Sequence, residues 1–179
     1  MRGTFRHMVL GFIILSALFG VACDPNKGTE SLAPKLELIG QKQVYDRTWQ
    51  YDSLLEFRFY YEDEDGDIGL DSKDTLDEFA FGAPYFYNFF CYMYALKNDT
   101  WLPVPNPFDP TQDLQFHERF PNLTPSGSDK RLSGELEIYI PARPNGVELD
   151  TVRFEMQLVD RALHKSNLCY SKEFILKHP

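Results

Sequence analysis

Thr151-Val152-Arg153-Phe154-Glu155-Met156-Gln157-Leu158 is the stretch that decides the fold, because apolar and polar side chains alternate along it without a break. A period of two places successive side chains on opposite faces of a β-strand. The same alternation recurs over residues 55–61 and 132–140, and shorter apolar pairs stand at 36–38 and 174–176. No segment of helical length shows a convincing period of 3.6, so the chain is expected to be all-β.

About seven strands within residues 35–179 predict an antiparallel β-sandwich. Residues 159–167, between the last two strands, resemble the terminal hairpin loop of bacterial immunoglobulin-like domains, whose usual text is D-x-A-G-N-x-S. Leu163 and His164 replace the pair that carries the glycine. Residues 101–125 hold six of the twelve prolines, and proline cannot donate to a β-ladder. The expected fold is therefore an immunoglobulin-like sandwich with a Pro-rich crossover or insertion.

Residues 85–96 (YFYNFFCYMYAL) are apolar or aromatic at almost every position. Twelve residues are too few to span a bilayer, which takes about 20. We interpret the run as a central strand that is covered on both faces. The alternative is a strand whose outer face is exposed and whose Phe and Tyr side chains bind a partner.

The N-terminus has the organisation of a secretory signal, with Arg2 and Arg6 followed by an apolar run over residues 8–22. The run ends in Gly20-Val21-Ala22-Cys23, which looks like a bacterial lipobox. Residues 1–22 are thus expected to be a lipoprotein signal peptide, and residues 23–34 a tether that carries lipid on Cys23. A plain secretory signal that happens to contain a cysteine is the alternative.

The charge of the chain limits its partners. Eighteen Lys and Arg against 27 Asp and Glu give a net charge of −9, which argues against nucleic acid, since phosphate binding needs a basic surface. Acyl chains on Cys23 would be the contact with the membrane. We expect an outer-membrane lipoprotein of the cell envelope. Because no acidic run follows Cys23 directly, the periplasmic face is favoured over the cell surface.

The densest chemical feature is the acidic loop Glu62-Asp63-Glu64-Asp65-Gly66-Asp67-Ile68-Gly69. Hard oxygen ligands at alternate positions suit Ca²⁺, although the spacing lacks the first aspartate and the last glutamate of an EF-hand. One interpretation is a Ca²⁺ site formed by the aspartates of this region: Asp63, Asp65, Asp67 and Asp71. The other is a turn alone, in which Asp accepts backbone hydrogen bonds and Gly supplies positive φ. The turn interpretation requires no cofactor.

Cys91 and Cys169 remain after Cys23 is lipidated. The envelope is oxidising, so a disulfide between them is one expectation. Both also fall in predicted strands, where a free cysteine commonly packs as a small hydrophobe. Both alternatives stay open.

No motif in the sequence predicts catalysis. His117, His164 and His178 lack the spacing of a zinc site, and the chain has no nucleophile elbow, metalloprotease helix or phosphate loop. We expect a protein that is not an enzyme and has no catalytic residue.

Three Asp-Ser/Thr-apolar triplets resemble the O-glycosylation acceptor of envelope proteins in the Bacteroidota. Their acceptor hydroxyls belong to Ser53, Thr75 and Thr151. The alternative is that Asp-Ser/Thr simply opens a strand after a turn.

Taken together, the chain resembles an uncharacterised family of Bacteroidota lipoproteins. The residues that carry the resemblance are the D-x-D-G-D-x-G loop over 63–69, the L-x-P-x-G text at 123–127, the alternating strand at 132–140 and the D-R-A-x-x-x-S-N hairpin at 160–167. The resemblance implies an envelope address and an immunoglobulin-like fold, and it brings no known activity.

The first functional hypothesis is a non-enzymatic binding or accessory subunit of an envelope complex. Its contact surfaces would be the aromatic strand, with Tyr85 and Tyr87, and the Pro-rich crossover, with Trp101. The second is a calcium-supported carbohydrate-binding module, which would expose rings such as Trp49, Tyr51 and Trp101. An enzyme is the third hypothesis and has no support in the sequence.

Overall fold

The computed structural model describes residues 32–128, 130–144 and 147–177. The predicted signal peptide (1–22), the lipidation residue Cys23 and the tether up to residue 31 lie outside the described residues. Within the described part of the chain, no helix has the length and apolar character needed to cross a membrane.

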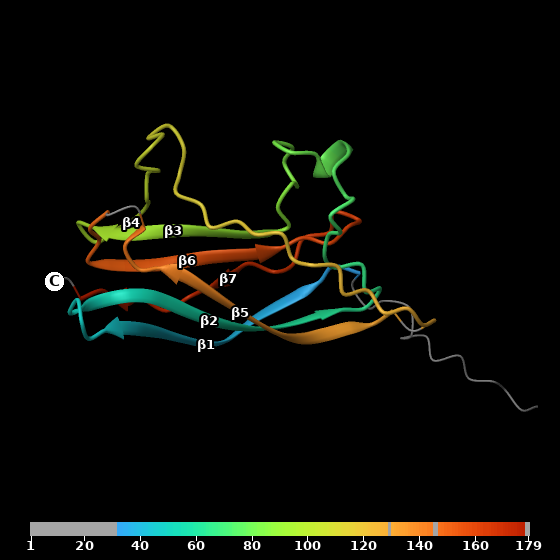
Figure 1. Cartoon of the computed structure of the whole chain (residues 1–179), viewed down its shortest axis with the longest axis horizontal. Helices are drawn as coiled ribbons and strands as arrows, with labels where there is room; N and C mark the ends of the chain where they lie inside the picture. Colours follow the sequence, from blue (N-terminus) through green and yellow to red (C-terminus); the bar gives the residue numbers. More distant parts are fainter. Residues whose placement is uncertain (1–31, 129, 145–146, 178–179) are drawn as a thin grey trace, which may run out of the picture. The chain divides into compact units, whose positions relative to one another are not determined.

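The described residues form two antiparallel sheets that pack face to face (Figure 1). The first sheet has the order β1-β2-β5, with β1 at Lys35–Asp46, β2 at Tyr51–Asp63 and β5 at Leu132–Pro141. The second has the order β4-β3-β6-β7, and β8 also pairs with β6. Its strands are β3 (Phe89–Lys97), β4 (Thr100–Pro103), β6 (Thr151–Leu158), β7 (Cys169–Tyr170) and β8 (Phe174–Ile175).

This strand order is that of an immunoglobulin-like sandwich, as expected. Strands β1, β2 and β5 take the places of strands A, B and E, and the second sheet takes those of C′, C, F and G. The described residues form eight strands where about seven were expected. The difference arises because the last strand is interrupted into β7 and β8, and because the short β4 pairs with the end of β3.

The core is the layer of side chains between the two sheets. Along β6 every second residue is buried, and along β2 the alternation buries Leu55, Phe57, Phe59 and Tyr61. Phe57 packs edge-on against Phe154 at 5.0 Å between ring centroids and thereby joins the two sheets. The alternation of apolar and polar residues gives each sheet one apolar face. The two sheets pack as a sandwich because this packing buries both apolar faces.

The interpretation of residues 85–96 as a strand covered on both faces is wrong in two respects. The strand β3 starts only at Phe89. Its inward side chains are buried, whereas its outward ones, including Phe90 and Tyr92, are only half-buried. The outer face of the second sheet is thus partly open.

The Pro-rich segment 101–125 is an ordered crossover, as expected, apart from its first three residues, which belong to β4. It returns along the free edge of β3, where Phe116 N–H donates to the carbonyl oxygen of Cys91 at 2.9 Å and Glu118 N–H to that of Phe89 at 2.9 Å.

Cys91 and Cys169 are both free and buried, which agrees with the second of the two alternatives, cysteines that pack as small hydrophobes, and not with a disulfide. The register gives the reason. Cys91 on β3 and Cys169 on β7 both lie opposite Met156, on the strand between them. Neighbouring strands are about 4.8 Å apart, so the two Cα atoms lie about two strand spacings apart, beyond the reach of about 7 Å that a disulfide allows.

Candidate functional site

The acidic loop begins where β2 ends and turns sharply away from the strand. Gly66 has φ of 64° and Gly69 has φ of 97°, and both values lie in the region that glycine adopts without strain. A Cβ on Gly66 would collide with the carbonyl oxygen of Lys130. The expected turn chemistry is present, and it brings Asp63, Asp65 and Asp67 round a tight bend.

A second segment meets this loop from the other sheet. The hairpin after β6 places Asp160 opposite Ile68 in an isolated antiparallel bridge. Arg161 N–H donates to the carbonyl oxygen of Asp67 at 3.3 Å. Leu163 closes the hairpin with φ of 68°, so the left-handed residue is present although the glycine is not.

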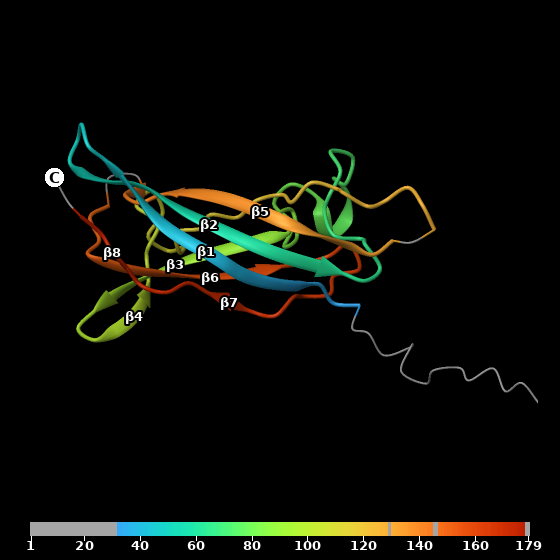
Figure 2. The same cartoon turned by 90° about the horizontal axis from the view of Figure 1, so that it is seen from below.

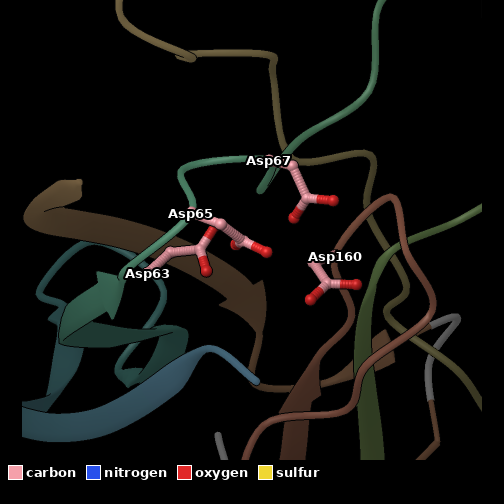
Figure 3. Close-up of side chains that lie close together, drawn as sticks. All are labelled: Asp63, Asp65, Asp67 and Asp160. Atoms are coloured by element: carbon pink, nitrogen blue, oxygen red, sulfur yellow. The ribbon is translucent and has the colours of Figure 1, made fainter. Parts of the chain in front are cut away.

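Four aspartates therefore converge at the end of the sandwich (Figure 3). Each has a carboxylate oxygen that lies within 4.8 Å of those of the other three. We call this group the aspartate cluster; its members are Asp63, Asp65, Asp67 and Asp160.

The oxygens of the cluster divide into two sets. Asp63 Oδ2 accepts a hydrogen bond from Ile68 N–H at 2.9 Å, and Asp67 Oδ2 accepts one from Ala162 N–H at 3.1 Å. The other oxygens of these residues, and Oδ1 of Asp65, are buried without a hydrogen-bond partner in the described structure. Asp160 accepts from the backbone N–H and from Nδ1 of His164, at 2.7 and 2.9 Å.

Burial and mutual repulsion make the charged forms of these carboxyls unfavourable. Burial, followed by the negative charges of Asp65 and Asp67, raises the pKa of Asp63 to about 7. Burial, followed by the charges of Asp160 and Asp65, raises the pKa of Asp67 to about 6. The pKa of Asp160 is also raised, chiefly by burial. A cation among them would remove this penalty.

The structure brings together three of the four aspartates expected from the sequence and leaves Asp71 outside. Its carboxylate accepts from Asn122 Nδ2 at 2.9 Å and lies 3.9 Å from Arg161. Asp160 stands in its place. The sequence shows Asp160 only as the first residue of a hairpin motif, and nothing in its local text indicates proximity to residue 63.

The second feature is a groove on the outer face of β3, which we call the aromatic groove. Its volume is about 460 Å³. Two segments that project from this sheet, on the side away from β1 and β2, form its walls (Figure 1). Its floor and walls include Phe81, Phe86, Tyr87, Phe90, Tyr92, Gln112, Gln115 and His117.

His117 lies among aromatic rings at the centre of this groove. The ring centroids of Tyr92, Phe90 and Tyr87 lie 4.7, 5.0 and 6.0 Å from that of His117. Its Nδ1 accepts the Cys91 N–H at 3.0 Å, and burial lowers the pKa of His117 to about 4. His117 is therefore neutral at physiological pH, and the described lining of the groove includes no Asp, Glu, Lys or Arg.

One wall of the groove is fixed at its base beside the aspartate cluster. The segment 71–87 contains the short 3₁₀ helix η1 (Asp77–Phe79). The guanidinium of Arg119 donates to the carbonyl oxygens of Asp71 and Asp74 at 3.0 Å each. Arg161, next to Asp160, pairs with Asp74 at 2.7 Å. The acidic loop and this wall of the groove are consecutive in sequence, and the contacts of Arg119 and Arg161 hold the wall beside the aspartate cluster.

The residues expected to form a binding surface are divided between this groove and its surroundings. Tyr87 lines the groove, and Tyr85 lines an adjoining hollow that also contacts Phe90 and Tyr92. Trp101 on β4 is half-buried, with the Arg153 guanidinium 4.5 Å from its ring. His117, Gln112 and Gln115 lie in the Pro-rich crossover that was predicted as a contact surface, but the sequence did not single them out, because only the return of the crossover along β3 places them beside the strand.

The rings named for a carbohydrate-binding module do not form one platform. Trp49 is 66% exposed in the turn between β1 and β2. Tyr51 starts β2 and is covered by Arg143 at 5.3 Å, and Trp101 lies on the other sheet.

The three predicted glycosylation acceptors differ in accessibility. Thr75 is exposed in segment 71–87, whereas Thr151 is half-buried at the start of β6. Ser53 is half-buried in β2, and its hydroxyl donates to the carbonyl oxygen of Val44 at 3.0 Å. Thr75 is the acceptor that an enzyme would reach without opening a strand.

Comparison with family models, with curated proteins and with solved structures finds no match to this chain. The site has therefore to be interpreted from its own residues.

Proposed function

We propose that this chain is a lipoprotein of the bacterial cell envelope that acts as a non-enzymatic binding or accessory subunit, with the aromatic groove as its contact surface. The observation that carries the proposal is the groove itself. Phe81, at its rim, is 88% exposed, and exposed aromatic side chains gathered in a concave site are typical of binding surfaces.

The proposed location in the cell envelope depends on the sequence alone. A diacylglycerol on Cys23 would anchor the domain in the outer membrane, with the periplasmic face favoured, and the resemblance to Bacteroidota lipoproteins supports the same location. Replacing Cys23 with Ser should abolish labelling by a palmitate analogue and release the protein from the membrane fraction. Retention of the label by the C23S variant would contradict the lipid anchor on Cys23, and it would leave the proposal of binding through the groove unaffected.

Binding through the groove is tested by photo-crosslinking in the native envelope. A photoreactive amino acid at position 81 should give a discrete adduct with a partner protein or glycan. The matched control is the same amino acid at Tyr139, which is 52% exposed on the outer side of the other sheet. Equal adducts at both positions, or none at position 81, would contradict the groove as the contact surface.

A neutral saccharide is the second candidate for what the groove binds. Uncharged rings can stack on the apolar faces of a sugar, and the amides of Gln112 and Gln115 can bond its hydroxyls. A glycan array with the purified chain tests this candidate. Replacing Tyr92 with Ala should weaken any hit at least tenfold and Tyr139 with Ala should leave it unchanged, while a silent array would favour a protein partner.

A further inference from the structure

The aspartate cluster unites two chain segments that come from different sheets. Asp63, Asp65 and Asp67 follow β2 of the first sheet, and Asp160 follows β6 of the second. We infer that the cluster binds one Ca²⁺ ion, with Asp160 rather than Asp71 as the fourth carboxylate, and that the ion fastens the two sheets together at this end of the sandwich.

The buried oxygens without partners are the first support. Asp63 is 1% exposed, and its Oδ1 has no hydrogen-bond partner in the described structure. Leaving a buried polar atom unpaired costs about 1–3 kcal/mol, and more when the atom is charged. The unpaired Oδ1 atoms of Asp65 and Asp67 belong to the same cluster, and the four carboxylates lie close together (Figure 3).

The hydrogen bonds that are made support the same conclusion. Asp63 accepts with Oδ2 the Ile68 N–H of its own turn, and Asp67 accepts with Oδ2 the Ala162 N–H of the hairpin after β6. These bonds fix the carboxylates and leave Oδ1 free for a ligand. His164, bonded to Asp160 through both its backbone N–H and its ring, orients the fourth carboxylate, as outer-shell partners of metal ligands commonly do.

The charge of the cluster also favours a cation. Among the described residues, the ion pair that reaches the cluster comes from His164, 2.9 Å from Asp160, and it carries charge only when the ring is protonated. The neighbouring guanidinium of Arg161 is directed to Asp74 instead, at 2.7 Å. Two buried and two half-buried carboxylates, with no Lys or Arg partner among the described residues, would be stabilised by a divalent ion.

The donor set favours Ca²⁺ over other metals. All four donors are hard carboxylate oxygens, with no thiolate or imidazole among them, and such sets suit Ca²⁺ or Mg²⁺ rather than zinc or copper. Mg²⁺ usually keeps several waters and takes one or two protein carboxylates, whereas Ca²⁺ accepts six to eight oxygens in flexible geometry. Carboxylates converging from two loops fit the larger ion.

The experiment is a calcium titration of the purified full-length chain in detergent, after treatment with EDTA. Isothermal calorimetry and thermal unfolding are recorded with Ca²⁺, and with Mg²⁺ for comparison, up to concentrations above about 1 mM, the range of weak extracellular sites. We expect one Ca²⁺ per chain, a rise in the unfolding temperature, and weaker binding of Mg²⁺.

Two matched variants separate the ligand sets. Asp160→Asn should weaken Ca²⁺ binding at least tenfold, and Asp71→Asn should bind as the wild type does. Loss of binding in Asp71→Asn with retention in Asp160→Asn would overturn the assignment. So would the absence of both calorimetric heat and a thermal shift in the wild type.

A third variant, Asp65→Asn, separates a loss of Ca²⁺ binding from a loss of folding. In the presence of EDTA, Asp65→Asn should unfold at the same temperature as the wild type or higher, because it removes one of the repelling charges. In Ca²⁺ it should lose the thermal shift. A calcium-induced shift in Asp65→Asn equal to that of the wild type would overturn the inference.

Discussion

At the scale of single residues, the acidic loop shows how an aspartate can stabilise a turn and remain available to a ligand. Asp63 holds Ile68 N–H with one oxygen and keeps the other unpaired. The two interpretations left open by the sequence, a turn or a metal site, are therefore compatible. The turn is observed, and the metal is our proposal.

Gly66 is the residue on which this turn depends most. Gly66→Ala would place a Cβ against the Lys130 carbonyl oxygen at a backbone φ of 64°. Positive φ alone costs a non-glycine residue about 1–2 kcal/mol, so with the collision we expect a loss of about 3 kcal/mol in the free energy of unfolding, measured by urea denaturation in EDTA.

Gly82→Ala is the control for the steric part of this prediction. Gly82 has φ of 83°, and a Cβ there would meet no atom within 4 Å. It should therefore show only the backbone cost of about 1 kcal/mol. Equal losses in the two variants would mean that Lys130 moves aside.

His117 should make the stability of the domain depend on pH. Its pKa is lowered to about 4 by burial, so between about pH 6.5 and 4 the unfolded chain binds a proton that the folded chain does not. The contribution of neutral His117 to the free energy of unfolding is fully present above pH 6.5 and is lost as the pH falls towards 4. We expect the loss to be about 2 kcal/mol.

The variant His117→Gln isolates this effect, because Gln can accept the Cys91 N–H without titrating. The difference in unfolding free energy between wild type and variant, followed by denaturation in EDTA from pH 7 to pH 4.5, should shrink as the pH falls. The aspartate cluster also titrates in this range, but it does so in both proteins. A difference that stays constant with pH would contradict the lowered pKa of His117 in the folded chain.

At the scale of elements, strand register decides the chemistry of the two cysteines. Cys91 and Cys169 pair with Met156 from the two sides of β6. They therefore lie on the same face of the sheet but on strands that are not adjacent. We expect mass spectrometry of the unreduced chain to find no peptide in which Cys91 is linked to Cys169. Detection of that linkage would require β6 to be displaced from between β3 and β7.

At the scale of the whole molecule, stability depends on the contact between the sheets. Phe57 is fully buried and packs edge-on against both Phe154 and Phe174 of the opposite sheet. Phe57→Ala should lower the free energy of unfolding by about 3–5 kcal/mol, measured by urea denaturation. Tyr139→Ala, on the exposed face of β5, should change it by about 0.5 kcal/mol or less.

Most of the fold follows from the sequence, because alternation is a local property. Residues 151–158 and 132–140 read as strands from their own side chains, and Gly66 and Gly69 mark the turn. The short pairs β7 and β8 were not separated, since two-residue strands carry no period. The half-open face of β3 was only the alternative interpretation, because aromatic side chains at every position look alike whether a crossover covers them or not.

The sequence by itself determined the two-layer β architecture, the acidic turn after residue 62 and the expected lipid address at Cys23, since each depends on residues adjacent in the chain. The tertiary structure alone decided that Asp160 joins Asp63, that Cys91 and Cys169 stay apart, and that His117 lies beside Tyr92. These pairs are separated by 25 to 97 positions. Their proximity is set by strand register and sheet packing, which no local pattern encodes.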